Sequence, residues 1–474
     1  MRCLVWFREH DLRCVDNHAL YHASKMATDG VIALFIISPK EWQSHDMAAC
    51  RVDFILRNLN CLSQQLNRLN IPLLIHTANS YTDIPQLLLS IAHTHKIEGL
   101  FFNEQYEWDE LGRDRKVVRL FKQNQIAVAY YADQVILRPG EVKTANNSFF
   151  TIFTPFKKAW FNRLHELGGV SVIPTPKKQK QLSINSDTVP ISINGFSSTI
   201  PSDLWPAGEQ YAQHRLKTFI ENKLFNYQHD RDFPLLNGTS TLSPYLTSGI
   251  ISPRQCLQAV LDANNGQLEK GNNGAITWVS ELIWREFYKH ILIGFPRVCK
   301  HRAFKLHTEK LPWQYDKKLF SAWQNGQTGF PIIDAAMRQL NSTGWMHNRL
   351  RMIVAMFLSK HLFIDWRWGE KHFMQHLIDG DLAANNGGWQ WAASTGTDAV
   401  PYFRIFNPIS QSERFDPDGS FIKQYCPELV SLNSKLIHEP WLLNNEEVEE
   451  LHFPKPIVDL KEARTKALLA FKNL

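Results

Sequence analysis

The sequence predicts an α/β domain with a parallel sheet, a long connector and an all-helical carboxyl-terminal domain. Up to about residue 133, short apolar runs alternate with amphipathic stretches, as strands alternate with helices. Residues 174–206 are rich in Ser, Asn, Thr and Pro and follow neither period. Beyond them helical spacing dominates. We therefore expect an α/β domain over 1–133, a connector over 134–206 and a helical domain over 207–474.

Five apolar runs in the first part of the chain are typical of buried strands: 3–7, 31–37, 72–76, 99–102 and 126–131. Six residues between the second and third runs step by three or four positions: Val52, Ile55, Leu59, Leu62, Leu66 and Leu69. This spacing predicts one helical stripe that faces a sheet. No Gly-x-Gly-x-x-Gly follows the first run, which argues against a Rossmann dinucleotide site.

The composition is that of an ordinary globular protein of two or three domains. The net charge of +6 permits a nucleic-acid partner, provided that basic residues gather in a local patch. The seven cysteines are scattered and form no Cys-x-x-Cys, so neither a disulfide framework nor a zinc site is indicated. No signal peptide or membrane-spanning run is found, and we expect a cytoplasmic monomer without a membrane partner.

The segment 275–293 predicts a helix with two distinct faces. One is an apolar stripe of Val279, Ile283, Phe287 and Ile291. The other combines a carboxylate, a guanidinium and two aromatic rings: Glu281, Trp284, Arg285 and Tyr288. Such a face can stack on flat groups and hydrogen-bond their edges. The alternative is a half-buried helix with a surface ion pair.

A second cluster lies in 344–352, where Asn348 shares a side with Arg351 and Met352, and Arg349 follows closely. Arginines beside aromatic residues fit phosphate or base recognition, although a solvated helix end has the same composition. Nine of the fifteen tryptophans lie between positions 278 and 391, a density that suits electron hopping as well as packing.

The segment 378–398 combines carboxylates, amides and many small residues without a hydrophobic period, unlike a core helix. Small residues let the backbone approach a large planar ligand, and Asp379, Asp381 and Asn385 supply oriented polar groups. The alternative is an ordinary tight loop.

These segments resemble the flavin domain of class I cyclobutane pyrimidine dimer DNA photolyases, of the bacterial folate type, within the photolyase/cryptochrome family. The motifs are Leu-Ile-Trp-Arg-Glu-Phe-Tyr at 282–288, Asn-Ser-Thr-Gly-Trp-Met-His-Asn-Arg-Leu-Arg-Met at 341–352, and 379–398. The likeness runs along the whole chain, from Trp-Phe-Arg at 6–8 to Arg-Ile-Phe-Asn-Pro at 404–408. It implies an α/β domain followed by a helical FAD domain, as the periodicities predict.

The resemblance implies a non-covalent FAD that is active as its reduced anion. Residues expected around its phosphates and ribityl chain are Tyr227, Thr239, Ser240, Thr241, Leu242 and Ser243. Further contacts are expected from Asn348, Arg351, Asp379 and Asp381. Asn385 is expected to face the reactive ring nitrogen, where an amide, unlike a carboxylic acid, favours the reduced anion.

The resemblance also implies light-driven repair of ultraviolet-damaged DNA, in which excited reduced flavin lends one electron to an extruded pyrimidine dimer. Trp389, Trp366 and Trp313 are expected to relay electrons to oxidised flavin. The lesion pocket is expected to contain Glu281, Trp284, Asn348, Met352 and Trp391. The DNA phosphates are expected to meet Arg231, Arg285, Arg349 and Arg404.

A 5,10-methenyltetrahydrofolate antenna is expected at Asp109, Glu110, Cys299 and Lys300, with a deazaflavin as the alternative. Two features depart from the family pattern: Asp109 stands where Asn is common, and one extra residue lies near Glu9 and His10. The rival functions are a cryptochrome-type receptor, against which Asn385 argues, and repair of the (6-4) photoproduct, whose enzymes usually place a His where Met346 stands.

Overall fold

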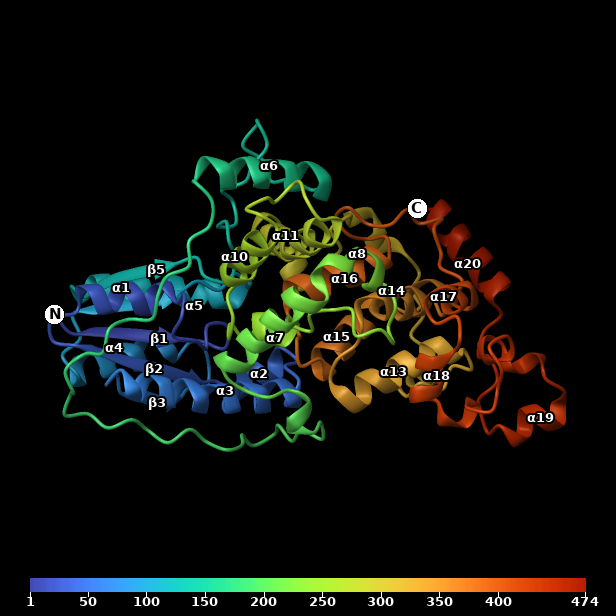
Figure 1. Cartoon of the computed structure of the whole chain (residues 1–474), viewed down its shortest axis with the longest axis horizontal. Helices are drawn as coiled ribbons and strands as arrows, with labels where there is room; N and C mark the ends of the chain where they lie inside the picture. The colour runs from blue at the N-terminus through green and yellow to red at the C-terminus, as the bar shows by residue number, and fades with distance from the viewer. The chain divides into compact units, whose positions relative to one another are not determined.

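The computed structural model describes the backbone of residues 1–474 and the side chains of all of them except residues 445 and 448. The chain forms two compact units (Figure 1). The first unit comprises Met1–Phe225, Ser240–Pro296 and Ile378–Asp381. The second comprises Asn226–Thr239, Arg297–Leu377 and Leu382–Leu474. The domain boundaries expected at residues 133 and 206 stay a prediction.

The first unit contains a five-stranded parallel sheet with the strand order β3-β2-β1-β4-β5. Its strands are β1 (Cys3–Phe7), β2 (Val31–Ile37), β3 (Leu73–Thr77), β4 (Gly99–Asn103) and β5 (Ala127–Tyr131). Val5 of β1 pairs with Ala33 on one side and Phe101 on the other. Strands β1, β2 and β4 are buried along their whole length, as in sheets that helices cover on both faces. The sheet confirms the expected fold class.

The helices beside the sheet follow the apolar spacing of the sequence (Figure 1). They are α1 (His18–Met26), α2 (Pro39–Ser44), α3 (Ala49–Arg68), α4 (Ile84–Thr94) and α5 (Trp108–Gln123). In α3 the expected stripe is buried from Val52 to Leu66, whereas Leu69 lies at the carboxyl-terminal cap. Burial of this stripe against the sheet is what the three-to-four spacing predicts.

Helices also form much of the rest of the first unit, with irregular stretches at 132–152 and 167–201. Its helices are α6 (Phe153–Glu166), α7 (Glu209–Asn222), α9 (Ser243–Thr247), α10 (Pro253–Ala263) and α11 (Asn273–Gly294). Helix α6 lies within the interval expected to be a connector. In α11 the predicted apolar stripe is buried and the second face is half-exposed.

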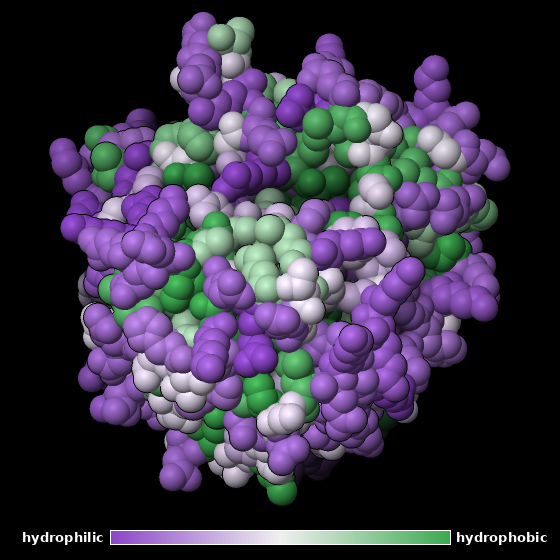
Figure 2. Space-filling model, turned by 90° about the vertical axis from the view of Figure 1, so that its left-hand side faces the viewer, coloured by the Kyte–Doolittle hydropathy of each residue, from purple (hydrophilic) through white to green (hydrophobic). Residues whose placement is uncertain are grey.

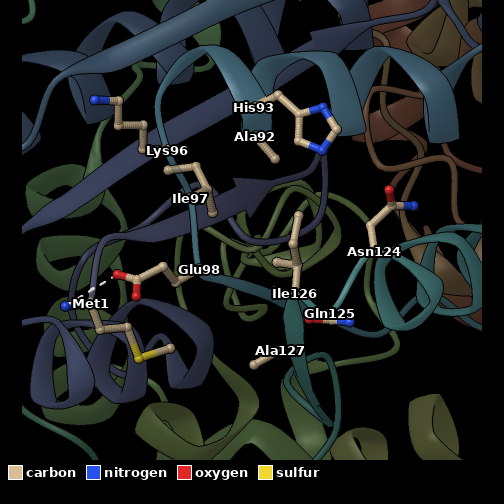
Figure 3. Close-up of a pocket in the computed structure, with 10 residues that line it drawn as sticks. All are labelled: Met1, Ala92, His93, Lys96, Ile97, Glu98, Asn124, Gln125, Ile126 and Ala127. Atoms are coloured by element: carbon tan, nitrogen blue, oxygen red, sulfur yellow. Dashed lines mark ion pairs between the residues drawn. The ribbon is translucent and has the colours of Figure 1, made fainter.

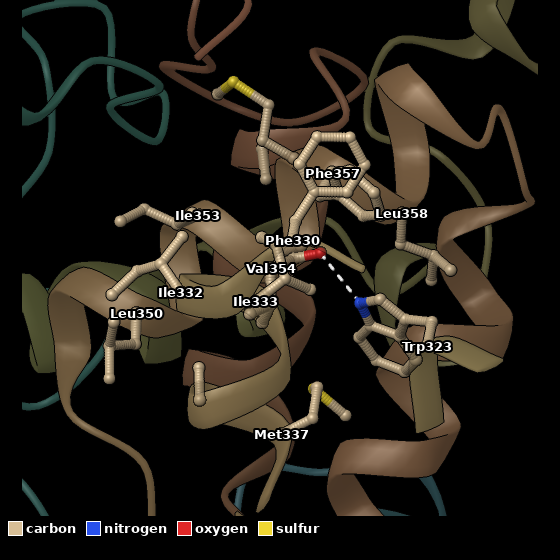
Figure 4. Packing of buried hydrophobic residues seen from close by; sticks show 14 of the residues in the cluster. Trp323, Phe330, Ile332, Ile333, Met337, Leu350, Ile353, Val354, Phe357 and Leu358 are labelled. Atoms are coloured by element: carbon tan, nitrogen blue, oxygen red, sulfur yellow. Dashed lines mark hydrogen bonds between the residues drawn. The ribbon is translucent and has the colours of Figure 1, made fainter. Parts of the chain in front are cut away.

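The second unit is built from helices around one large apolar core. They include α8 (Tyr227–Asp230), α12 (Lys317–Gln324), α13 (Pro331–Thr343), α14 (Asn348–Met356), α15 (Trp366–His376), α16 (Leu382–Ala392), α17 (Pro408–Phe415), α18 (Ser420–Tyr425), α19 (Asn445–Glu450) and α20 (Leu460–Lys472). The π-helix η5 (Phe357–His361) follows α14 directly. Figure 4 shows part of this core, where the indole nitrogen of Trp323 donates to the carbonyl of Val354 at 3.2 Å.

Helix α16 corrects the expectation that 378–398 is unlike a core helix, because Trp389 and Ala392 are buried on it. The missing hydrophobic period has a packing reason. A Cβ on Gly369 of α15 would lie 2.1 Å from the ring of Trp389, so the two helices approach each other through a glycine. Close packing of small residues therefore replaces the usual apolar stripe.

One face of the surface is mostly hydrophilic (Figure 2), and a hollow lies near the amino-terminal ends of three strands. Hydrophilic side chains cover most of the face in Figure 2, with apolar ones interspersed. A hollow lined by Met1, Glu98 and Ala127, among others, lies where β1, β4 and β5 begin (Figure 3). Ligands of parallel α/β sheets bind at the opposite, carboxyl ends of the strands. Within the described chain, no helix has the length and apolar character needed to cross a membrane.

Candidate functional site

The loop that carries Asp379 and Asp381 is held by three elements of the first unit. Asp381 forms an ion pair with Lys289 of α11 at 2.7 Å, and the lysine is fully buried. Arg51 of α3 donates to the carbonyl of Gly380, and Thr247 of α9 donates to that of Asp379 at 3.4 Å. A buried carboxylate that is paired and anchored keeps a fixed direction. The Asp381 carboxylate can thus offer an oriented acceptor to a ligand, and the backbone of Asp379 is held two residues before it.

The turn at 239–243 combines hydroxyls with a cationic neighbour. Thr241 adopts a left-handed backbone (φ 48°), and its hydroxyl accepts a hydrogen bond from Arg215 of α7. Leu242 N–H donates to the hydroxyl of Ser240 at 3.4 Å. Turn amides, hydroxyls and a guanidinium form the donor set that suits a diphosphate. No sequence motif marks Arg215, which lies in an otherwise ordinary amphipathic helix.

Asn385 in the second unit is oriented by Glu370. Its Nδ2 donates to the backbone carbonyl of Glu370 at 2.9 Å. The buried Glu370 carboxylate accepts from Asn386 Nδ2 at 2.7 Å and pairs with His301 at 3.1 Å. One residue of α15 therefore fixes both amides of α16 and the turn after residue 300. Glu370 could not be predicted from the sequence, because it lies fifteen positions before Asn385 and outside every motif.

Helix α14 brings together several expected ligand and DNA contacts. Asn348 and Arg349 both lie 4.0 Å from the sulfur of Met352, and Arg349 pairs with Asp232 at 2.7 Å. Arg351 directs its Nε to the carbonyl of Met346 at 2.8 Å.

Two expected residues of the second unit lie together on α8 and just after it. Tyr227 is buried, and the guanidinium of Arg231 lies 5.5 Å from the centroid of its ring. Asp232, the partner of Arg349, is also 3.8 Å from Arg231. The Asp232 carboxylate thus lies beside Arg231 and Arg349, two of the four arginines that are expected to meet DNA phosphates.

The second face of α11 is engaged inside the first unit. Trp284 stacks on Phe153 of α6 with ring centroids 3.7 Å apart and an interplanar angle of 7°. Arg285 donates to the carbonyls of Gln134 and Leu246, which favours an anchoring role for it. Glu281 is half-exposed on the same face. Contacts of these residues with DNA stay a prediction.

The three expected relay tryptophans all lie in the second unit. Trp389 and Trp366 are buried on α16 and α15, which pack through Gly369. Trp313 packs on Phe363, three residues before Trp366, with ring centroids 4.9 Å apart. Trp323, which the family pattern did not include, lies edge-to-face against Trp389 at 6.0 Å. The relay order stays a prediction.

Glu110 and Asp109, two of the expected antenna residues, converge on His45 in the first unit. His45 lies 3.4 Å from Glu110 and 3.3 Å from Asp109, and Tyr81 donates to Glu110 at 3.1 Å. The hydrogen bond to Glu110 and the carboxylate charges raise the pKa of His45 to about 9. Burial opposes ionisation of Glu110, but His45 outweighs it and lowers the pKa of that carboxyl. Cys299 and Lys300 end a short turn in the second unit.

The crevice between the carboxyl ends of β1 and β4 is filled by the chain itself. Arg8 lies 3.9 Å from the centroid of the Trp6 ring, pairs with Asp114 at 2.8 Å and donates to Gln105 at 3.2 Å. Arg8 and Gln105 are buried. This is the topological switch point, where ligands of such sheets usually bind. A chromophore there would have to displace a buried ion pair.

Polar groups that suit parts of FAD are present within each unit taken by itself. The anchored Asp381 carboxylate suits the hydroxyls of a ribityl chain, and the turn that Arg215 contacts suits the diphosphate of FAD. Because Nδ2 of Asn385 is bound to the Glu370 carbonyl, Oδ1 is the side-chain atom left to accept a hydrogen bond. Such an acceptor suits an N–H of a reduced flavin ring. A parallel α/β sheet, a helical unit and this set of polar groups together define a class of flavin-binding proteins that are built from two units.

Comparison with known proteins identifies the family. Residues 3–178 match the family model described as DNA photolyase. Residues 278–473 match the FAD binding domain of DNA photolyase. The chain belongs to the DNA photolyase family.

Relatives match over nearly the full length. The deoxyribodipyrimidine photo-lyases of Salmonella typhimurium and Escherichia coli are each 46% identical over 469 residues, covering 99% of this chain and 98% of theirs. A crystal structure of a bacterial class III photolyase from Agrobacterium tumefaciens is 32% identical, with a TM-score of 0.85 over 99% of this chain and 97% of that one. A Synechocystis cryptochrome is 27% identical, with a TM-score of 0.86 over 99% and 98%.

Proposed function

We propose that the protein is a flavin-dependent enzyme that restores pyrimidines from cyclobutane dimers in DNA under near-ultraviolet or blue light. The observation that carries this function is the 46% identity to deoxyribodipyrimidine photo-lyases along the whole chain. The higher identity to photo-lyases than to the cryptochrome, 46% against 27%, favours repair over signalling. The expected partner is ultraviolet-damaged DNA, and we expect the enzyme to act as a cytoplasmic monomer.

The proposed contacts of the flavin are the polar groups described above within each unit. Asp379 and Asp381 bind its ribityl hydroxyls, the turn at 239–243 with Arg215 binds its diphosphate, and Asn385 accepts from its ring. Bound reduced FAD would supply the one-electron chemistry that opens the dimer, and since the electron would return to it, no external reductant would be consumed per turnover. Tyr227, Asn348 and Arg351 complete the proposed contacts.

The lesion is extruded from the duplex before it can react, since a stacked base cannot reach a buried flavin. Trp284 and Trp391 flank the dimer and Glu281 hydrogen-bonds a pyrimidine edge. The Phe153 stack supports this role of Trp284, because a ring backed at 3.7 Å offers a pre-ordered surface. Asn348 and Met352 line the pocket, and Arg231, Arg285, Arg349 and Arg404 meet the phosphates.

The proposed antenna is 5,10-methenyltetrahydrofolate. Its proposed contacts are Asp109, Glu110, Cys299 and Lys300. The filled switch point supports a site away from the carboxyl ends of β1 and β4. An absorption spectrum of the native protein tests the proposal, because a folate absorbs in the near ultraviolet and a deazaflavin at longer wavelength. A deazaflavin band, or the release of no folate on denaturation, rejects it.

The test of the function is repair of one defined lesion. Purified flavoprotein is mixed with an oligonucleotide carrying a single thymine cyclobutane dimer, either in darkness or under blue light. Loss of the dimer only in the light supports the proposal, and equal loss in darkness overturns it. An oligonucleotide with a (6-4) photoproduct is the matched control, and repair of it alone would assign the rival substrate.

A further inference from the structure

Lys360 is a buried lysine in the second unit, with an exposed fraction of 0%, and lies inside the π-helix η5. Such π-turns are rare and occur frequently at functional sites. Within the described chain the Lys360 ammonium meets hydroxyl and carbonyl oxygens, and no carboxylate pairs with it. Burial of an ammonium without a counter-ion is unfavourable for folding. The position therefore calls for a reason other than stability.

The ammonium makes three hydrogen bonds to one loop, residues 393–407. It donates to the hydroxyl of Ser394 at 2.8 Å and to the carbonyls of Arg404 and Tyr402 at 3.1 and 3.4 Å. A lysine ammonium has three hydrogens, so the 393–407 loop uses all of them. Lys360 thus joins the start of the loop to its middle.

The residues that accept hydrogen bonds from Lys360 determine the path of the 393–407 loop. Ser394 adopts a left-handed backbone (φ 63°), and its N–H donates to the carbonyl of Trp391 at 3.3 Å. A non-glycine residue holds this conformation only when its surroundings enforce it. Arg404 and Phe403 are exposed on the far stretch, Phe403 by 60%.

Two neighbours of Lys360 hold the end of the same loop. His361 Nε2 donates to the carbonyl of Phe406 at 2.8 Å, and the Phe406 N–H donates to the sulfur of Met356 at 3.1 Å. Carbonyls at alternate positions, 402, 404 and 406, therefore face the π-helix. The helical run 356–361 therefore holds the loop at residue 394 and again over residues 402–406.

We propose that Lys360 is a positioning residue for lesion recognition, whose ammonium holds the 393–407 loop so that Trp391 and Arg404 meet the damaged DNA together. The proposal rests on the proposed function, which assigns both residues to DNA. Ordering the loop before binding lowers the entropy lost on binding. Lys360 touches no reacting atom, so it acts on affinity and leaves repair of bound DNA unchanged.

The protonation state of Lys360 provides a second test of the proposal, because it makes lesion affinity depend on pH. Burial, and next the charge of Lys305, lower the pKa of Lys360 to about 7. The other charged groups nearby are His361 on the same helix, Arg464 beside His361, and Asp398 beside Lys305. Above pH 7 Lys360 is mostly a neutral amine, which has only two hydrogens to donate to its three acceptor oxygens. Lesion affinity should therefore fall as the pH rises through 7.

Stability should move the opposite way. The pKa of the lysine is near 10.5 in the unfolded chain and about 7 in the folded one, so between these values the unfolded chain binds more protons. The contribution of Lys360 to the free energy of unfolding therefore rises with pH in this window. Affinity and stability with opposite pH trends separate positioning from a purely structural role.

The experiment measures binding of the flavin-loaded protein to a single-stranded oligonucleotide with one thymine dimer and to the same oligonucleotide without it. Lys360→Met should weaken the damage-specific affinity about tenfold, as for the loss of a charged hydrogen bond, with repair of saturated complexes unchanged. Lys360→Arg stays charged and should remove the loss of affinity above pH 7. Ser359→Ala is the matched control, since Ser359 is buried on η5 and donates only to Ala355.

Hydrogen exchange of the amides at 402–406 gives a readout that needs no DNA, and it should accelerate in Lys360→Met. Should that variant not fold, Ser394→Ala removes one partner and should show the same direction of change. Unchanged affinity and unchanged exchange in the variant that folds overturn the proposal. Failure of the wild-type protein to prefer damaged DNA would reject the proposed function instead, and exchange alone then decides on the loop.

Discussion

The side-chain amide of Asn385 donates to the backbone carbonyl of Glu370 across 2.9 Å. A carbonyl oxygen can only accept, so this contact requires the NH₂ group on the side of Glu370 and the oxygen on the other. The identity of residue 385 as an amide is therefore fixed by the helix behind it as well as by the proposed ligand in front.

Asn385→Asp should reduce light-dependent repair by at least about tenfold. An ionised carboxylate cannot donate to the Glu370 carbonyl and adds a negative charge beside the proposed reduced anion. Repair of a dimer-containing oligonucleotide at equal flavin content measures the effect. Gly388→Ala is the control on the same helix, because a Cβ at the exposed Gly388 meets no atom within 4 Å. Equal repair by Asn385→Asp would contradict the proposed role.

Lys289→Met should lower the free energy of unfolding by about 3 kcal/mol, since it leaves the buried Asp381 carboxylate without its ammonium partner. Urea denaturation measures the change. The double variant with Asp381→Asn should recover part of the loss, because no unpaired charge then remains at the site. A double variant as unstable as the sum of the single ones would mean that the two residues are not coupled.

The sequence predicted the elements that rest on a local period and missed those that depend on tertiary packing. The stripe of α3 shows in the spacing of Val52 to Leu66, because each residue meets the sheet through its own side chain. Helix α16 has no such stripe, since its partner helix contributes Gly369 at the contact. Its small residues therefore suggested an irregular segment.

The residues of the candidate site fall into the same two groups, those that the sequence predicted and those that depend on tertiary packing. Polar residues within motifs were found, whereas Glu370, Lys289 and Lys360 were not, because charged residues are usually exposed and their burial is set by distant neighbours. His45 was missed for a related reason. Its partners Asp109 and Glu110 lie on another helix, so no spacing in the sequence connects them.

Trp284→Ala should weaken binding of dimer-containing DNA by about 1 to 3 kcal/mol, the range for loss of one stacked aromatic ring. Phe153→Ala should weaken it less, because Trp284 keeps its ring and loses only the support behind it. Binding to damaged and undamaged oligonucleotides measures both effects. If Phe153→Ala costs as much as Trp284→Ala, the ring at 153 contacts the lesion itself.

Trp313→Phe should slow photoreduction of the oxidised cofactor and spare repair by enzyme that is already reduced. An indole gives up an electron more readily than a phenyl ring, whereas the phenyl ring preserves most of the packing on Phe363. Absorbance under illumination follows the reduction. Trp441→Phe is the control, since Trp441 packs on Phe330 in the same core. Normal photoreduction in Trp313→Phe would remove Trp313 from the relay.

The pairing of His45 with Glu110 should make the free energy of unfolding depend on pH. The pKa of His45 is about 9 in the folded protein against 6.5 for an unperturbed histidine, so between these values the folded state holds a proton that the unfolded chain has lost. The stabilising contribution is complete below pH 6.5 and is lost as the pH rises through 9. With a side chain that is 33% exposed, screening reduces it to about 1 to 2 kcal/mol.

The measurement compares urea denaturation of the wild type and His45→Gln at several pH values. The difference between them should shrink as the pH rises from 6.5 to 9. Asp109→Asn should keep most of the effect, because the Asp109 side chain is 63% exposed and Glu110 is the buried partner. A constant difference across this range would show that His45 is not held as a cation by Glu110, and Tyr81 would then be the main partner of that carboxylate.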